Sequence, residues 1–420
     1  MERLYSILEF MKIKDIVRFH SETTTPIPDV VYHLYSLPSF DNNQTREELL
    51  GQDIQSNKFT VPNRCILFNK LNVRFKRIWR IDSDEDHKIS STEFLPLIID
   101  ENKVDFDYCF YLLASPAITD YLCGQNANTS GSHKRIDPTN FFNIGIKLPP
   151  LAQQYEIGKL LSSLDTKIKL NRAINQNLEA MAKQLYDYWF VQFDFPNEEG
   201  KPYKSSGGEM VWNEKLKREI PKGWQASNVC SIADILSGGT PSKQEPMFWN
   251  NGTIPFFGPT DYSGSIFQIE TAENITAEGL SRCASSLFDV GTIIITARGS
   301  IGKMVIVGTP MAMNQSCYAL KSRNNEFEYL FFLTAQLIEC LKAKGSGSTF
   351  KSIISSDIEQ STLCIAPQSF ITQFGLVVKP LFEKIKDNSF EIATLTKQRN
   401  ELLPLLMNGQ VSVNSDLSDD

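Results

Sequence analysis

The chain has 420 residues, 41% of them hydrophobic and 22% charged, and a formal net charge of -7. This composition is typical of a globular protein with two or more cores, and it argues mildly against nucleic acid as a partner, although the distribution of charge matters more than its sum. No run of about 18 apolar residues suggests a membrane span, the N-terminus is unlike a signal peptide, and the eight cysteines form no CxxC pair. We therefore expect a cytoplasmic protein with reduced thiols and no membrane partner.

A first globular unit is expected at residues 12–149. IKDIV is expected to be a short apolar segment, YSLPSFD an extended piece with a turn, and SNKFTVPNRCILFNKLNVRFKRIWRI a set of strands. EFLPLIIDENKVDFDYCFYLLASPAITDYLC is expected to begin as a loop that leads to helical segments, with a break at Ser115 and Pro116. This mixture predicts an α+β unit. The segment 64–80 holds six cations and no acidic residue, which indicates a basic patch: Arg64, Lys70, Arg74, Lys76, Arg77 and Arg80.

Residues 150–192 are predicted to form one long helix, because apolar residues recur in steps of four and three as in a heptad seam. Adding 217 to each number gives a second seam in residues 368–411, with the charged Arg399 as an exception. Two unrelated amphipathic helices are the alternative. The predicted seam residues are Ile157, Leu161, Leu164, Ile168, Asn171, Leu178 and Leu185 in the first helix, and Phe374, Val378, Leu381, Ile385, Asn388, Leu395 and Leu402 in the second.

The same offset relates Lys134 to Lys351 and Pro150 to Pro367, so it extends beyond the helices. We conclude that the chain is a tandem duplication of a globular unit followed by a long helix, and we expect the two helices to pair as an antiparallel coiled coil. Asn171 and Asn388 occupy equivalent seam positions, where a buried amide can fix the register of two helices. Direct contact between these two side chains is a hypothesis.

The second unit, residues 225–367, follows a linker at 193–224 that is rich in Gly, Pro and charge and is expected to be an extended connector. LFDVGTIIITARGSIGKMVIV is expected to form two strands around a Gly-containing turn, and EFEYLFFLTAQLIECLKAK a helix. The loop GSGSTFKSI corresponds to GSHKRI of the first unit, which suggests two copies of one binding surface. The acidic residues 412–420 are expected to form a flexible tail.

Motifs of catalysis are incomplete in this sequence. GSIGKM resembles a phosphate-binding loop, but Ala297 stands where that loop needs Gly and Met304 where it needs Ser or Thr. The four histidines lack metal-ligand spacing, and the tetrapeptide of amino-methyltransferases is absent. Asp100, Glu101 and Lys103 could imitate a nuclease pattern, yet adjacent acids on a loop are more often simply solvated. Neither a catalytic residue nor a metal site is therefore expected.

Binding is the remaining function, because small hydrogen-bond donors and cations gather on Gly-containing loops, where they could meet phosphates or base edges. Solvated turns are the alternative for any single residue. The candidate DNA-binding residues are Arg64, Lys70, Asn72, Arg74, Lys76, Ser132, His133 and Lys134 in the first unit, and Thr240, Ser242, Lys243, Arg298, Ser300, Lys303, Ser348, Thr349 and Lys351 in the second.

These segments resemble the specificity subunit of type I restriction-modification systems over nearly the whole chain. FDFPNEEGKPYKSSGGEMVWNEKLKREIPKGW is similar to the central region of that family, and GGTPSK, ARGSIGK and GSTFKSI resemble motifs of its target-recognition domains. YSLPSFD, SNKFTVP and ILFNKLN resemble a different subclass of the same domain. Two departures stand out: Val73 replaces a proline common in that subclass, and the first unit has no GGTPS match.

The resemblance implies two target-recognition domains that each read one half of an interrupted DNA target, with the helices setting the gap. A helix of about 30 residues spans roughly 45 Å, somewhat more than one turn of B-DNA. It also implies that catalysis belongs to partners: modification subunits, expected to be two, that methylate adenine with S-adenosylmethionine, and restriction subunits that use ATP and Mg²⁺. No cofactor is expected on this chain itself. A structural adaptor that binds proteins and a fused enzyme are the alternative functions.

Overall fold

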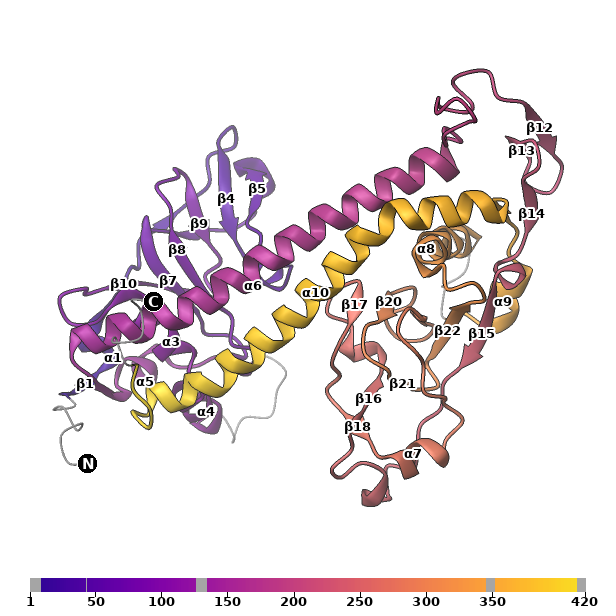
Figure 1. Cartoon of the computed structure of the whole chain (residues 1–420). Helices are drawn as coiled ribbons and strands as arrows, with labels where there is room; N and C mark the ends of the chain where they lie inside the picture. The colour runs from indigo at the N-terminus through magenta and orange to yellow at the C-terminus, as the bar shows by residue number, and fades with distance from the viewer. Residues whose placement is uncertain (1–8, 43, 126–133, 345–351, 414–420) are drawn as a thin grey trace, which may run out of the picture. The chain divides into compact units, whose positions relative to one another are not determined.

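The computed structural model describes residues 9–42, 44–125, 134–344 and 352–413. It divides into two compact units, with Met1–Thr166 and Leu395–Asp420 in unit 1 and Lys167–Thr394 in unit 2. The long helices α6 (Leu151–Tyr186) and α10 (Gln368–Met407) each contribute a segment to both units (Figure 1). Each unit combines β-sheets with helices, so the α+β fold expected from the sequence is confirmed.

The central sheet of unit 1 has the order β2-β10-β7-β8, and all three pairings are antiparallel. The four interior residues of strand β7, Cys65 to Phe68, are apolar because both faces of the strand are covered. Ile66 and Phe68 join the core that holds the helices of this unit, whereas Cys65 and Leu67 pack with Trp79 on the other face. The bounds are β2 (Val17–Phe19), β10 (Phe94–Ile99), β7 (Arg64–Asn69) and β8 (Ile78–Asp82).

A second sheet of unit 1 has the order β3-β6-β9-β4-β5. Its strands are β3 (Thr23–Thr24), β6 (Lys58–Thr60), β9 (Lys88–Ser90), β4 (Val31–Tyr35) and β5 (Glu47–Leu50). Strands β1 (Glu9–Lys12) and β11 (Gly145–Leu148) form a separate pair. The helices are α1 (Ile13–Ile16), α2 (Leu37–Asp41), α3 (Phe106–Ala114), α4 (Pro116–Gln125) and α5 (Pro138–Phe142).

Two local predictions for unit 1 are wrong. YSLPSFD contains helix α2, which begins after Ser36 because the side chain of Ser36 accepts a hydrogen bond from the backbone N–H of Ser39. EFLPLIID contains the central strand β10 rather than a loop. Its Pro96 is tolerated because the carbonyl of Pro96 faces His20, just beyond the end of β2, so the missing N–H removes no bond to β7.

Unit 2 has a five-stranded sheet in the order β15-β22-β19-β20-β17 and a three-stranded sheet in the order β18-β16-β21. The predicted strand pair around a Gly-containing turn corresponds to β19 and β20. The strands are β15 (Ala233–Ser237), β22 (Cys317–Ser322), β19 (Ile293–Thr296), β20 (Met304–Val307), β17 (Phe267–Gln268), β18 (Asn274–Ile275), β16 (Ile254–Phe257) and β21 (Ala312–Met313). The helices are α7 (Ala277–Ser281), α8 (Phe327–Lys344) and α9 (Ser355–Gln360), and β14 (Gln225–Ser227) pairs with β23 (Leu363–Ile365).

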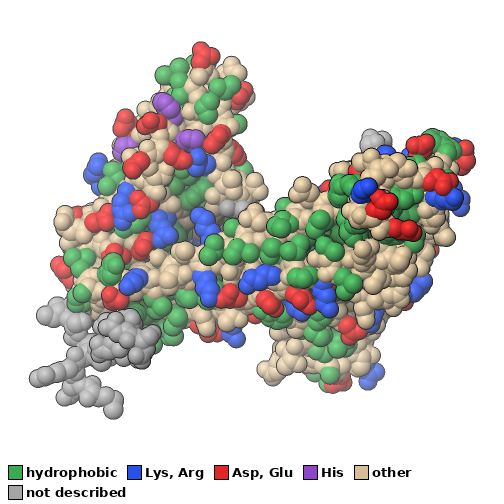
Figure 2. All heavy atoms as spheres, turned by 45° about the horizontal axis from the view of Figure 1, so that its top comes forward, with side chains coloured by type: hydrophobic (Ala, Val, Ile, Leu, Met, Phe, Trp, Pro, Cys, Tyr) green, Lys and Arg blue, Asp and Glu red, His purple; other side chains and the backbone are tan. Residues whose placement is uncertain are grey.

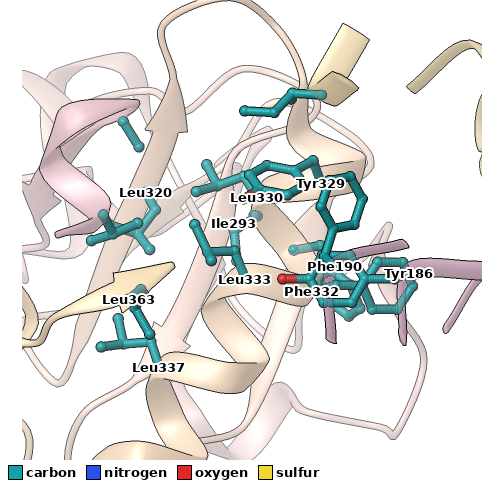
Figure 3. Packing of buried hydrophobic residues seen from close by; sticks show 14 of the residues in the cluster. Tyr186, Phe190, Ile293, Leu320, Tyr329, Leu330, Phe332, Leu333, Leu337 and Leu363 are labelled. Atoms are coloured by element: carbon teal, nitrogen blue, oxygen red, sulfur yellow. The ribbon is translucent and has the colours of Figure 1, made fainter. Parts of the chain in front are cut away.

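The core of unit 2 is built around α8, the helix predicted from EFEYLFFLTAQLIECLKAK. Tyr186 and Phe190, at the C-terminal end of α6 and in the π-helical turn after it (Asp187–Val191), meet Tyr329 and Phe332 of α8 (Figure 3). The ring centroids lie 5.1 Å apart for Tyr186 and Phe332 and 4.8 Å apart for Phe190 and Tyr329. Leu330 of α8 belongs to the same buried cluster as residues of β19 and β22. The sheet and the long helix of unit 2 therefore share one core.

Within each unit, the segments of α6 and α10 contact each other. In unit 2, the amide of Asn175 lies 2.8 Å from that of Asn388, and Asn171 donates to Glu391 at 2.7 Å, so partners run in opposite directions along the two segments. Among the seam residues, those that are buried are Ile157, Leu161, Ile168, Asn171, Phe374, Val378, Ile385, Asn388 and Leu395. Those that are half-buried are Leu164, Leu178, Leu185, Leu381 and Leu402.

The polar positions of this seam have defined partners. Asn388 pairs with Asn175 and not with Asn171, which lies one helical turn earlier, so the hypothesis named the wrong residue of α6. Hydrogen bonds from Lys167 and Asn171 lower the pKa of Glu391. In unit 1, the exceptional Arg399 donates to Asp165 at 2.7 Å, and the hydroxyl of Tyr111 donates to the other oxygen of Asp165 at 2.7 Å. Burial and the Asp165 carboxylate raise the pKa of Tyr111.

The linker 193–224 folds, so its prediction as an extended connector is wrong. Strands β12 (Met210–Asn213) and β13 (Arg218–Pro221) form a hairpin. Phe195 stacks on Tyr203 at 4.6 Å and on Trp224 at 5.2 Å, measured between ring centroids. Composition alone missed this because the few aromatic residues that hold the linker lie far apart in a polar sequence.

Candidate nucleic-acid interface

Each unit contains a β-hairpin at the same topological position. The strand order β2-β10-β7-β8 of unit 1 matches β15-β22-β19-β20 of unit 2, with antiparallel pairing throughout. In the second sheets, β4 pairs with β9 as β16 pairs with β21, and both pairings are parallel. Hairpin β7–β8 therefore corresponds to hairpin β19–β20, although their sequences differ.

The same backbone hydrogen bonds anchor both hairpins. The N–H of Ile136 donates to the carbonyl of Lys70 at 2.9 Å, and the N–H of Ile353 donates to the carbonyl of Ala297 at 2.9 Å. Ile136 and Ile353 are related by the offset of 217 that relates the long helices. In addition, the backbone N–H of Lys70 donates to the carbonyl of Glu93 at 2.9 Å, and the backbone N–H of Ala297 donates to the carbonyl of Ser316 at 2.8 Å. The turns 70–77 and 297–303 are therefore equivalent.

A short helical turn lies beside the hairpin in both units. Backbone Ser36 donates to Ser39 Oγ at 2.8 Å after β4, and backbone Gly258 donates to Asp261 Oδ2 at 2.8 Å after β16. In unit 1 this turn includes Asp41, which binds Arg77 of the hairpin through two bonds of 2.7 Å. The segments YSLPSFD of unit 1 and FGPTDYS of unit 2 therefore occupy equivalent positions in the fold.

In unit 1, the turn between β7 and β8 has an unusual backbone. Asn72 and Lys76 both have left-handed conformations, with φ of 52° and 45°. The backbone N–H of Asn72 donates to the carbonyl of Lys134 at 2.8 Å, and the N–H of Lys134 donates to Asn72 Oδ1 at 3.3 Å. Among the predicted residues, the structure therefore brings Lys70, Asn72, Arg74, Lys76 and Lys134 together.

The basic run 64–80 is not one patch. Arg64 begins β7, at the other end of the strand from the turn, and it pairs with Asp82 and Glu101. The hydrogen bond to Glu101 raises the pKa of Arg64. Arg80 is likewise paired with Asp107. Figure 2 shows acidic side chains beside basic ones on the visible face of the protein.

Three cations of the unit 1 turn remain uncompensated. Lys70, Arg74 and Lys76 form no ion pair with any residue in the described ranges, and Arg74 and Lys76 are exposed. Positive charge without a protein partner attracts polyanions such as DNA. The candidate interface of unit 1 is therefore centred on the turn and excludes Arg64.

In unit 2, glycines shape the equivalent turn. Gly299 and Gly302 have φ of 78° and 77°, a conformation that side chains rarely adopt. Arg298, Ser300 and Lys303 are exposed on this turn, and Lys303 Nζ lies 5.3 Å from the ring centroid of Tyr262. Because the turn joins two strands and does not lead into a helix, it is not a phosphate-binding loop of the nucleotide-hydrolase type.

The GGTPSK loop of unit 2 lies beside the segment that precedes β22. A Cβ on Gly238 would come within 2.2 Å of the Asn314 carbonyl oxygen, so this close approach requires glycine. The hydroxyl of Thr240 donates to the amide oxygen of the exposed Gln315. Sequence reasoning missed Gln315, whose only signal is a polar run between two apolar strands.

Two predicted residues of the GGTPSK loop differ in their availability. Ser242 is exposed. Lys243 binds both oxygens of Glu273 at 2.6 Å, and its ammonium lies 3.4 Å from the ring centroid of Trp249. Its charge is therefore compensated, which makes Lys243 a weaker candidate for DNA contact than Arg298.

Five predicted residues, Ser132, His133, Ser348, Thr349 and Lys351, lie outside the described residues. Within the described part of the chain, no group of three or more His, Cys, Asp or Glu residues could hold a metal ion. A search of the same residues finds no helix long and apolar enough to cross a membrane. The two turns offer cations, hydroxyls and amides, which can bind phosphates and base edges.

Comparison with known proteins gives a consistent result. The chain matches the family "Type I restriction modification DNA specificity domain" at residues 7–180 and 221–373. It is 29% identical to the type I restriction enzyme MjaIX specificity subunit of Methanocaldococcus jannaschii, covering 75% of this chain and 71% of that protein. It is 25% identical to the HindI specificity subunit of Haemophilus influenzae, covering 82% and 86%.

A solved structure shows the same fold. The crystal structure of the type I restriction-modification system S subunit from M. genitalium matches with a TM-score of 0.58 at 14% identity, covering 97% of each chain. Both relatives are named as specificity subunits of type I restriction enzymes. The chain therefore belongs to the type I restriction modification DNA specificity family, as its sequence led us to expect.

Proposed function

We propose that this chain is the DNA sequence-recognition subunit of a type I restriction-modification complex, in which each unit reads one half of a bipartite target. The observation that carries this proposal is the pair of equivalently anchored hairpin turns. Both turns present exposed cations, Arg74 and Lys76 in unit 1 and Arg298 and Lys303 in unit 2. Cations of this kind position a protein on the DNA backbone, while neighbouring hydroxyls and amides can read bases.

Chemistry in the complex is assigned to partner subunits. Two modification subunits would methylate adenine with S-adenosylmethionine, and restriction subunits would use ATP and Mg²⁺ to move along DNA and cut it. The long helices and the folded linker are the docking surfaces we assign to these partners, and the helices would set the spacing of the two half-sites. The complex would act in the cytoplasm, where bacterial and archaeal DNA lies.

A protein-binding adaptor explains the two units less well. Its duplicated surface would be expected to centre on a largely apolar patch. The equivalent turns instead carry charge and hydrogen-bond donors, with Lys70, Arg74 and Lys76 unpaired among the described residues of unit 1. A steep decrease of DNA affinity with salt would separate the two functions, because each phosphate contact releases counterions.

The decisive experiment is a methylation map of genomic DNA. Cells that express this chain with its neighbouring modification subunit are compared with cells that lack only this chain. Methyl-adenine in a single interrupted motif, lost without the chain, is the expected result and would reveal both half-sites. If the maps are identical and the purified complex selects no sequence from random duplex DNA, the proposal is wrong.

A further inference from the structure

Phe75 is an exposed aromatic residue at the centre of the unit 1 turn. Its side chain is 51% exposed, whereas Val73, two residues earlier, is 6% exposed and packs in the core of unit 1. Val73 therefore fixes the turn to the domain, and Phe75 contributes little to that core. A large apolar side chain left in water at a charged surface indicates a contact that forms with a ligand.

The surroundings of Phe75 keep its ring in place. The Cζ atoms of Arg74 and Arg77 lie 4.7 and 4.8 Å from the ring centroid. Arg77 is held by its two bonds to Asp41, whereas Arg74 has no ion pair with any described residue. Arg74 is thus free to move to a phosphate and uncover the ring, while Arg77 continues to support it.

The backbone on both sides of Phe75 is strained. Left-handed conformations at Asn72 and Lys76 are uncommon for residues other than glycine, and such strain is retained mainly where the surroundings enforce it at functional sites. Here the surroundings are the two hydrogen bonds between Asn72 and Lys134. The turn therefore holds an aromatic ring in position before any ligand binds.

We propose that Phe75 stacks on a DNA base at an opened base step within the half-site read by unit 1. An aromatic ring reaches the face of a base in a duplex only where two base pairs separate, and phenylalanine serves as such a wedge in proteins that deform DNA. The inference rests on the proposed function and adds a deformation of the DNA to it. Arg74 and Lys76, on either side of the ring, would bind the phosphates that flank the opened step.

The inference applies to one unit only. The equivalent turn of unit 2 holds Gly302 between Ile301 and Lys303 and carries no aromatic side chain. The connection between the paired strands is also one residue shorter in unit 2, because nine residues separate Phe68 from its partner Ile78 and eight separate Ile295 from its partner Met304. Opening of the DNA is therefore expected in one half-site and not in the other.

The test uses the complex of this chain with its modification subunits and duplexes that carry the methylation-mapped target. 2-Aminopurine replaces successive bases of the half-site assigned to unit 1, because its fluorescence rises when the base loses its stacking neighbours. The variants are Phe75→Ala and Phe75→Tyr, and the matched control is Phe10→Ala, which removes another phenylalanine of unit 1 that is 71% exposed.

The expected result is an emission rise at one position, kept by Phe75→Tyr and Phe10→Ala and lost in Phe75→Ala. Phe75→Ala should also weaken target binding about fivefold or more, with the salt dependence unchanged because no charge is removed. No rise with the unaltered protein, or binding by Phe75→Ala within about twofold and the same emission, would overturn the stacking role. Equal binding of target and scrambled DNA by the unaltered complex would instead refute the proposed function itself.

Discussion

Arg298→Ala is expected to reduce the salt dependence of DNA binding by one phosphate contact. Arg298 is exposed on the unit 2 turn and forms no ion pair with any residue that the structure describes. The candidate interface contains five cations that form no ion pair with any described residue: Lys70, Arg74, Lys76, Arg298 and Lys303. If each one neutralises a phosphate, the slope of log K against log salt is about -4.5, because one contact contributes about -0.9.

The assay is fluorescence anisotropy of a labelled target duplex titrated with the assembled complex between about 50 and 200 mM salt. Over this fourfold range, one contact accounts for a factor of about 3.5 in affinity. The factor by which affinity falls across this range should therefore be about 3.5 times smaller for the Arg298→Ala complex than for the unaltered complex. The Arg298→Ala complex should also bind more weakly at low salt.

Lys243→Ala is the matched control for Arg298→Ala. Both changes remove one positive charge from an exposed loop of unit 2, but Lys243 is already compensated by Glu273 and Trp249. Its removal should leave the slope nearly unchanged. Equal slopes for Arg298→Ala and the unaltered complex, or a larger change for Lys243→Ala, would refute the reasoning from uncompensated charge.

Three further outcomes are expected. Asp165→Asn should lower the free energy of unfolding of unit 1 by about 1–3 kcal/mol in urea titrations, because Arg399 loses its charged partner; a change near zero would contradict this. Asn388→Leu alone should destabilise unit 2, since the amide oxygen of Asn175 loses the donor Asn388, whereas replacing both asparagines by Leu should raise the melting temperature and loosen the register; a double variant less stable than the single one would argue against it. Exchange of residues 12–149 for those of another family member should alter one half of the methylated motif, and a change in both halves would exclude modular reading.

The long helices were predictable because their seam repeats over many turns. Because the apolar positions recur over many helical turns, one exception such as the charged Arg399 did not hide the pattern. Its partner Asp165 belongs to the other helix and could not be identified from the sequence of either helix alone. Strand β10 was missed for the opposite reason, since a single Pro96 outweighed five apolar neighbours in a short segment.

The candidate site was only partly predictable. Arg298, Ser300 and Lys303 were found because the glycines of ARGSIGK mark a tight turn. The charge run of unit 1 was misleading, because ion-pair partners are distant in sequence: Glu101 lies 37 residues after Arg64, and Asp41 lies 36 residues before Arg77. A charge pattern along the chain cannot show which cations will meet a carboxylate after folding.

The anchoring of the hairpin turns has a consequence for how such proteins evolve. The bond from Ile136 to Lys70 and that from Ile353 to Ala297 join backbone atoms only, so they place no demand on the side chains at positions 70 and 297. A lysine in one unit and an alanine in the other satisfy the same anchor. If the turns read DNA as proposed, substitutions at their exposed positions would change which sequence is favoured while these two anchoring bonds stay in place.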